Sequence, residues 1–279
     1  MHAEIPGILL RLLLGCVVGF TVGLTGIGGG VLTLPSLTLI LRLPPSLAVG
    51  TTSLCVFLTT TYSSYRHFRL KNVAAGAAGL FLLGAIPGNL AVSLLITTYL
   101  KSVHHDPASL RAFQTSIKHV IVAVILLSAV MLTINLARKG RGTESWRRGP
   151  ERTNRDSCWP RRIVAVLLGA IVGGLVGATS IGGAIMTVPV LILILGLSPS
   201  RTVGTSTFIA LVLTMLTSLI YGGNGEAEVH TAVLMAAGAW AGVYWGSRLS
   251  MRTSEKLLQC LVILVILFSV ALMLLQKTP

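Results

Sequence analysis

The sequence predicts an all-α polytopic membrane protein made of two inverted repeats, each with about five hydrophobic segments. Of its 279 residues, 53% are hydrophobic and only 11% are charged, and the mean hydropathy is +0.83. A soluble domain normally carries about 25% charged residues, so this chain has too little charge to cover a water-facing surface. Its apolar residues fall into five runs, a polar stretch and five more runs, which is the pattern of a duplicated membrane unit.

The first five runs lie at about residues 5–25, 31–43, 48–65, 73–100 and 114–136. The second five lie at about 163–178, 184–197, 203–222, 229–247 and 257–276. The runs 31–43 and 184–197 give only about 20 Å of helix, against a hydrocarbon core of about 30 Å. At these two places we expect a re-entrant hairpin or a broken helix, which is tolerated where the backbone is buried in protein or lines a polar cavity.

The two halves are copies of one unit. A shift of 154 residues aligns Gly23–Ser53 with Gly177–Thr207 without a gap, and 17 of these 31 positions are identical. Self-similarity at a fixed interval indicates an internal repeat. We therefore predict a first transmembrane repeat at 1–136, a basic linker at 137–162 and a second transmembrane repeat at 163–279.

The distribution of charge predicts the orientation of the chain. The linker carries nine of the 22 basic residues, so the positive-inside rule places it in the cytoplasm. The turn at 65–71 is also basic, whereas the corresponding turn at 221–228 is acidic, as expected if the second repeat is inverted. We expect a multi-pass membrane protein with both termini outside. The net charge of +14 therefore reflects anchoring in the lipid bilayer and does not indicate nucleic-acid binding.

The best-matched stretches of the two repeats contain glycine motifs, GLTGIGGGVLTLP (23–35) and GATSIGGAIMTVP (177–189). Glycines allow positive φ and expose backbone amides, and the helix that follows each motif offers partial positive charge at its N-terminus. This combination binds anions. The candidate binding residues are Thr25, Gly26, Gly28, Gly29 and Gly30 in the first half, and Thr179, Ser180, Gly182 and Gly183 in the second. Close helix packing is the alternative, but packing motifs space small residues by four, whereas these glycines are contiguous.

A second pair of matched stretches, PSLAVGTTS (45–53) and PSRTVGTST (199–207), adds hydroxyl groups to the candidate site. These are Thr51, Thr52, Ser53, Thr205, Ser206 and Thr207. Pro35 and Pro189 follow the glycine motifs and would loosen helical hydrogen bonding, as a gate requires. Arg66, His67 and Arg69 would draw anions to the cytoplasmic mouth, although positive-inside anchoring explains these residues equally well.

The apolar runs lack the groups that other functions would need. All eight carboxylates fall in loops or at the ends of runs, which argues against a cation pathway. The four cysteines show no CxxC spacing, so the sequence predicts no metal site and no cofactor. Ser180 has no GxSxG context, so we do not expect an enzyme. The expected partners are a small anion and the bilayer, and the sequence is compatible with a homodimer.

Two halves that each carry a GxGGG-like motif, a proline and a later VGT(T/S)(S/T) element resemble the sulfite exporter TauE/SafE family of membrane permeases. The resemblance covers the chain outside the linker. It implies transport, usually export, of sulfite or of organosulfonates such as sulfoacetate across the inner membrane of a bacterial cell. The second motif departs from the first at Ser180 and Ala184, where the first has Gly26 and Gly30. This difference suggests that one half binds the anion while the other acts as a gate. An anion channel, or an uptake permease for another small oxyanion, is the alternative.

Overall fold

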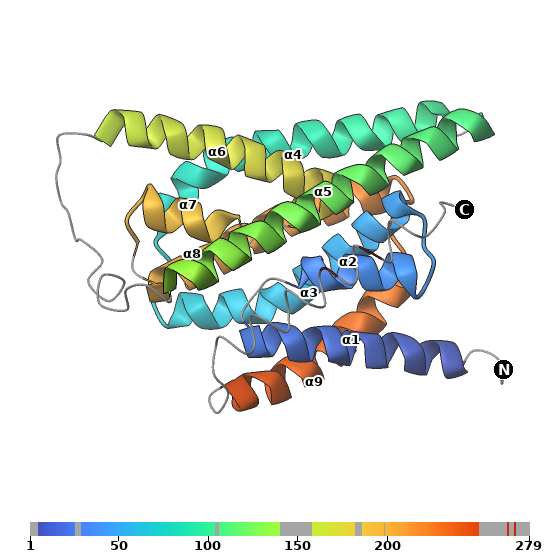
Figure 1. Cartoon of the computed structure of the whole chain (residues 1–279), viewed down its shortest axis with the longest axis horizontal. Coiled ribbons are helices and arrows are strands. Elements are labelled where there is room, and N and C mark those ends of the chain that lie inside the picture. Colours follow the sequence, from blue (N-terminus) through green and yellow to red (C-terminus); the bar gives the residue numbers. More distant parts are fainter. Residues whose placement is uncertain are drawn as a thin grey trace.

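The computed structural model describes residues 5–25, 29–103, 106–139, 158–181, 186–197 and 199–250, and the single positions 267 and 271. The described residues form a bundle of helices that lie mostly along one direction (Figure 1). In chain order the helices are α1 (Ile5–Thr25), α2 (Gly30–Leu39), α3 (Pro45–Arg69), α4 (Ala75–Val103), α5 (Pro107–Lys139), α6 (Cys158–Thr179), α7 (Thr187–Leu193), α8 (Pro199–Gly223) and α9 (Val229–Ser250). The predicted all-α fold is confirmed.

Each predicted hydrophobic run before residue 250 corresponds to one helix. Helices α2 and α7 have 10 and 7 residues, so at 1.5 Å per residue neither can cross a hydrocarbon core of about 30 Å. Helix α5 ends at Lys139 and α6 begins at Cys158, so both extend a few residues into the predicted linker and shorten it. The rest of the linker, 140–157, and most of the predicted run 257–276 lie outside the described residues.

Equivalent helices of the two halves begin and end in the same way. Pro45 and Pro199, which are 154 residues apart, are the first residues of α3 and α8, where a missing N–H is harmless. After α2 and α7 the chain turns at Arg42 (φ 53°) and Gly196 (φ 65°), which are also 154 residues apart. A residue with positive φ is a common end of a helix. The local structure therefore repeats at the interval found in the sequence.

Two pairs of helices pack through glycine, α1 with α9 and α4 with α6 (Figure 1). Each of these four helices carries two glycines four residues apart, and a β-carbon at any of them would overlap the backbone of the partner helix. The glycines are Gly15 and Gly19 in α1, Gly84 and Gly88 in α4, Gly169 and Gly173 in α6, and Gly238 and Gly242 in α9. Small residues at this spacing let membrane helices approach closely. We call these two contacts the glycine seams.

Each glycine seam joins one helix from each half of the chain. Gly15 faces the backbone of Met235 and Gly19 faces that of Ala239, so α1 and α9 run parallel. In the other seam, Gly169 and Gly173 of α6 face the backbones of Phe81 and Ala85 in α4. Each of these four residues lies 154 positions from its counterpart in the first seam. The packing therefore follows the sequence repeat well beyond its best-matched stretch.

Helices α3 and α8 lie between the seams and run antiparallel (Figure 1). Gly50, near the start of α3, faces Tyr221 at the end of α8 and Glu226 just after it. Conversely, Gly204, near the start of α8, faces Asn72 just after α3. Because α3 and α8 are equivalent helices of the two halves, these halves have opposite directions at this contact.

Helix α2 folds back along α1. Gly29, at its start, lies beside Val22 near the end of α1. Leu37, further along α2, packs in a hydrophobic cluster with Ala48 and Leu14, so α2 runs toward the beginning of α1. Of the two arrangements expected for the short run 31–43, a re-entrant hairpin or a broken helix, this return of the chain corresponds to the hairpin.

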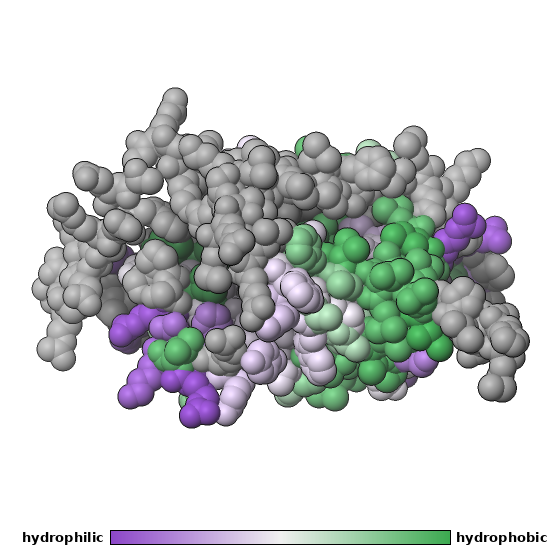
Figure 2. Space-filling view, turned by 90° about the horizontal axis from the view of Figure 1, so that it is seen from below, coloured by the Kyte–Doolittle hydropathy of each residue, from purple (hydrophilic) through white to green (hydrophobic). Residues whose placement is uncertain are grey.

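The described surface is that of a membrane protein. Within the described part of the chain, four helical stretches are long and apolar enough to cross a membrane: Ala75–Ser102, Ala108–Leu127, Arg161–Thr179 and Arg201–Gly223. Figure 2 shows a region of hydrophobic residues with hydrophilic residues toward either end of the molecule. Helix α3 is less apolar and contains many buried hydroxyl groups, which suits its position between other helices.

Candidate functional site

The glycine motif of the first half and that of the second half are in contact with each other. Gly30, at the start of α2, packs so closely on Ser180 that a β-carbon would overlap the Ser180 carbonyl oxygen. Ser180 follows α6 with a φ of 55°, a region that non-glycine residues rarely occupy. Gly29 has a φ of −57° because α2 begins there, so the expected positive φ is not found at this glycine. The contact of Gly30 is of the kind that the close-packing alternative predicts.

Gly26, Gly28, Gly182 and Gly183 lie outside the described residues, as do the side chains of Thr25, Pro189 and Arg66. The assignment of the glycines and Thr25 to an anion site therefore stays a prediction.

Ser180 links the second motif to α3 of the first half. Its hydroxyl donates a hydrogen bond to the Val49 carbonyl oxygen at 2.9 Å and also contacts the hydroxyl of Ser53. The hydroxyl of the preceding residue, Thr179, accepts the amide of Ile181 at 3.2 Å. All these side chains are buried, so the structure brings Ser53, Thr179 and Ser180 into one polar cluster between the halves.

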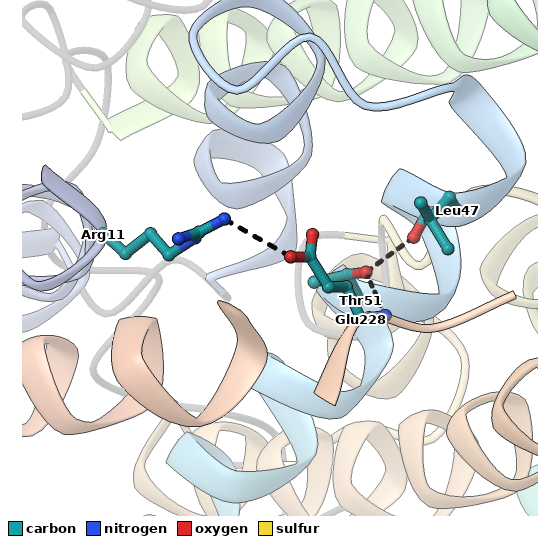
Figure 3. A network of polar contacts seen from close by, with 4 residues as sticks. All are labelled: Arg11, Leu47, Thr51 and Glu228. Atoms are coloured by element: carbon teal, nitrogen blue, oxygen red, sulfur yellow. Dashed lines mark hydrogen bonds and ion pairs between the residues drawn. The ribbon is translucent and has the colours of Figure 1, made fainter. Parts of the chain in front are cut away.

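Thr51 and Thr205 bind backbone groups of the opposite half. Thr51 Oγ1 donates to the Leu47 carbonyl oxygen at 2.7 Å and accepts the amide of Glu228 at 3.0 Å (Figure 3). Thr205 Oγ1 accepts the amide of Ala74, also at 3.0 Å. Glu228 and Ala74 directly precede α9 and α4, so each threonine hydroxyl accepts a hydrogen bond from a backbone amide at the start of a helix, where amides lack partners within the helix. The Thr51 hydroxyl proton is thus engaged by its own helix.

Thr52, between these hydroxyls, is fully buried and its Oγ1 has no hydrogen-bond partner. It lies one helical turn from both Val49 and Val56 on α3. The Val49 carbonyl accepts a hydrogen bond from Ser180, and the Val56 side chain lies 3.8 Å from the position that a β-carbon on Gly29 would take. Thr52 is therefore on the face of α3 that looks toward both motifs, and its hydroxyl is a donor available to a ligand.

The remaining hydroxyls of the second half are bonded differently. Ser206 and Thr207 both donate to the Val203 carbonyl oxygen in their own helix, at 3.0 and 2.8 Å. Thr187 on α7 resembles Thr52, because its Oγ1 is buried and without a partner. Among the described residues, α3 and α7 thus each carry a buried threonine hydroxyl without a hydrogen-bond partner.

A small cavity of about 20 Å³ lies between α1, α2, α3 and α9, which is about the room that one water molecule needs. Gly29, Thr33, Cys55 and Thr59 are among its lining residues. Thr33 and Thr59 donate to carbonyl oxygens of their own helices, so this lining is mostly apolar. The cavity marks the place where the start of α2 meets the middle of α3.

The predicted gate and mouth residues occupy separate places. Pro35 is buried inside α2, and Pro189 lies inside α7. Arg69 is exposed at the end of α3, with a nitrogen 3.4 Å from the Tyr65 hydroxyl, and His67, two residues earlier, is half-buried. A role in attracting anions stays a prediction. Among the described residues no group of three or more His, Cys, Asp or Glu side chains could hold a metal ion.

One buried polar group was missed by the sequence analysis. Asn89 on α4 is fully buried, and its side-chain amide donates to Thr217 Oγ1 at 2.9 Å and to the Gly173 carbonyl oxygen at 3.3 Å. It thereby ties α4 to α8 and α6. An amide inside the apolar run 73–100 is itself a signal, because polar side chains inside membrane segments are costly and usually functional.

A second missed group surrounds the loop before α9. An Arg11 nitrogen lies 3.3 Å from a Glu228 carboxylate oxygen, in the view of Figure 3. Ser46 donates to the Glu226 carboxylate at 2.8 Å, and Gln114 donates to Ser46 at 2.9 Å. These residues come from four separate stretches of the chain, so no local pattern could have revealed the cluster.

The family model described as "Sulfite exporter TauE/SafE" matches residues 11–273. The chain belongs to the sulfite exporter TauE/SafE family. Its relatives include the "Probable membrane transporter protein YjnA" of Bacillus subtilis, 30% identical over 92% of this chain and 96% of that protein. The "Probable membrane transporter protein YunE" of the same organism is 25% identical over 88% of this chain and 90% of that protein. No solved structure matches. This TauE/SafE protein is a membrane transporter.

Proposed function

We propose that this TauE/SafE protein exports a sulfur-containing oxyanion or an organosulfonate, such as sulfite or sulfoacetate, across the bacterial inner membrane. The family description supports this substrate class. The observation that carries the proposal is the buried, unpartnered hydroxyl of Thr52 on the face of α3 that looks toward both glycine motifs.

An unpaired hydroxyl in a protein interior costs about 1–3 kcal/mol, and an oxyanion that accepts its proton would remove that cost. Hydrogen bonds to charged groups are also stronger than neutral ones. Backbone amides at the start of α2 would add donors and the positive end of a helix dipole. Ser53 and Ser180 lie next to this position and add two more hydroxyls.

The described carboxylates support an anion over a cation. Asp106, Glu226 and Glu228 lie in loops outside the helices, so within the described part of the chain no negative side chain sits in the middle of a membrane helix. A membrane potential that is negative inside would then drive anion export, at about 2.3 kcal/mol per charge per 100 mV.

We also propose that residues 1–136 and 163–279 form inverted repeats, with the linker 137–162 in the cytoplasm and both termini outside. The antiparallel pair α3 and α8 and the exchanged glycine seams support this arrangement. Transporters of this architecture bind substrate near the interface of their repeats, which is also where Thr52, Ser53 and Ser180 lie.

Transport assays in proteoliposomes test the function. Sulfite, thiosulfate, sulfate and short sulfonates are supplied under imposed pH and voltage gradients, with empty liposomes as the control. We expect voltage-sensitive movement of a sulfur anion that internal unlabelled anion accelerates by counterflow. Movement without counterflow would indicate a channel, movement only inward would indicate an uptake permease, and rates equal to those of empty liposomes would contradict the substrate class.

A further inference from the structure

We propose that two contacts between the halves, at opposite ends of the molecule, are the two gates of the transport path. The Thr51 joint consists of Gly50, Thr51, Glu226 and Glu228, and the Thr205 joint consists of Gly204, Thr205, Asn72 and Ala74. The proposal depends on the transporter function of the chain and not on which anion it carries.

Each joint contains the same hydrogen bond. Thr51 accepts the amide of Glu228 and Thr205 accepts the amide of Ala74, both at 3.0 Å. The two threonines are 154 residues apart, and so are the two amides. In each case the acceptor belongs to one half and the donor to the other, so these bonds must break if the halves separate at that end.

Each joint also contains a backbone contact that only glycine permits. A β-carbon on Gly50 would overlap the carbonyl oxygen of Glu226, and one on Gly204 would lie 2.5 Å from that of Asn72. Real β-carbons essentially never come this close to backbone atoms. The start of α3 and the start of α8 are therefore sealed against the facing loop without an intervening side chain.

The loops that complete the joints are shaped alike. Lys71 (φ 55°) and Gly225 (φ 79°), again 154 residues apart, turn the chain after α3 and α8. The next residues, Asn72 and Glu226, donate their amides back to those helices at 3.1 and 2.8 Å. Each loop thus moves with the helix before it, and a joint can open as a unit when α3 and α8 shift.

The positions of the joints suit alternating access. Because α3 and α8 run antiparallel, the Thr51 joint and the Thr205 joint lie at opposite ends of this pair. Ser53 and Ser180 add one more contact between the halves, two residues beyond Thr51 on α3. Rocking of one repeat against the other would open one joint and keep the other closed. Both joints are closed in this structure.

The two joints differ in strength. Glu228 is paired with Arg11, and Glu226 accepts a hydrogen bond from Ser46, so the Thr51 joint has two additional side-chain contacts. At the Thr205 joint the positions of Glu226, Glu228 and Arg11 are taken by Asn72, Ala74 and Ala165, and Ala74 and Ala165 cannot form an ion pair. The Thr205 joint therefore opens more readily.

Accessibility of a native cysteine tests the gates. Cys55 is buried and lines the small cavity beside α2, so it reports on water reaching the middle of α3. In protein whose other cysteines (Cys16, Cys158 and Cys260) are replaced by alanine, a membrane-impermeant thiosulfonate is applied to one face of oriented vesicles at a time. Thr51→Val should raise the rate at Cys55 about fivefold from the Glu228 end alone, and Thr205→Val should do so from the Ala74 end alone.

Matched variants separate gating from plain stabilisation. Thr51→Ser and Thr205→Ser keep the accepting oxygen and should keep the parent rates. Thr60→Val removes a hydroxyl that bonds only within its own helix, and it should change neither rate. An increase from the same face in both valine variants, or no increase in either, would overturn the proposal.

A cross-link provides an independent test if a valine variant does not fold. Ser46 and Glu226 touch through their side chains, so a disulfide between Ser46→Cys and Glu226→Cys would lock the Thr51 joint. We expect Cys55 to lose reactivity from the Glu228 end alone, and transport to stop until a reductant is added. Undiminished transport with the disulfide formed would overturn the gate at this end.

Discussion

Three adjacent residues of α3 show how one helix serves several purposes. Thr51 binds the amide of Glu228, Thr52 has no partner, and Ser53 contacts Ser180. Successive residues of a helix point about 100° apart, so the three hydroxyls face different neighbours. The sequence predicted this hydroxyl cluster but not its division of roles, because Glu228 and Ser180 are distant in sequence and only the fold brings them together.

Replacement of Thr52 by valine should have opposite effects on stability and on binding. Valine keeps the shape and removes a buried hydroxyl that has no partner, so the free energy of unfolding of the anion-free protein should rise by about 1 kcal/mol. The same change removes a donor to the proposed anion, so stabilisation by sulfite should be lost. Thermal unfolding in detergent, with and without sulfite, measures both effects.

Thr97→Val is a suitable control for this prediction. Thr97 is also buried, but its hydroxyl donates to the Ser93 carbonyl oxygen in its own helix and so already has a hydrogen-bond partner. This control should unfold at the same or a lower temperature and keep its response to sulfite. A Thr52→Val protein that unfolds earlier than the parent and still responds normally to sulfite would assign Thr52 to packing alone.

At the scale of whole helices, the sequence was most informative where hydrophobicity alone decides the structure. Long apolar runs must become helices in a membrane, because every backbone group needs a partner there. The short runs also predicted that α2 and α7 are too short to cross a membrane, although α7, with 7 residues, is half as long as its run at 184–197. The glycine seams were missed, although Gly15, Gly19 and their counterparts show both the spacing of four and the shift of 154 residues. That signal lay outside the stretch 23–53, where the repeat was recognised.

The glycine seams predict large effects from the smallest substitution. In Gly84→Ala the new methyl group would overlap the Val166 carbonyl oxygen across the α4–α6 seam. Overpacking of this kind typically costs 1–3 kcal/mol, so the melting temperature should fall clearly. Because the seam lies away from Thr52, protein that remains folded should still be stabilised by sulfite.

The same helix offers a matched control. Gly79 lies five residues before Gly84 on α4, and a β-carbon there would meet nothing within 4 Å. Gly79→Ala should leave the melting temperature unchanged or raise it slightly, since alanine favours helix over glycine. Equal losses in the two variants would mean that α4 responds to helix propensity and not to close packing with α6.

At the scale of the molecule, the two ends carry different charge. Arg69 is the last residue of α3 and Lys71 lies in the loop after it, whereas the equivalent loop after α8 carries Glu226 and Glu228. Two equivalent loops of opposite charge at opposite ends are what an inverted repeat under the positive-inside rule requires. Glu228 also pairs with Arg11 at the Thr51 joint, whereas the equivalent positions at the Thr205 joint are Ala74 and Ala165. The two joints therefore share their architecture but differ in the strength of their contacts.

The orientation can be tested with equivalent single cysteines. Leu70 and Asn224 are 154 residues apart and lie in the loops after α3 and α8. In protein whose native cysteines are replaced by alanine, an impermeant maleimide should label Asn224→Cys from outside the cell. Leu70→Cys should react only from inside, together with Ser145→Cys in the linker, because basic segments stay in the cytoplasm. Cysteines placed at the two termini should react from outside. If Leu70→Cys and Asn224→Cys react from the same face, the repeats cannot be inverted, and the two proposed gates cannot face opposite sides of the membrane.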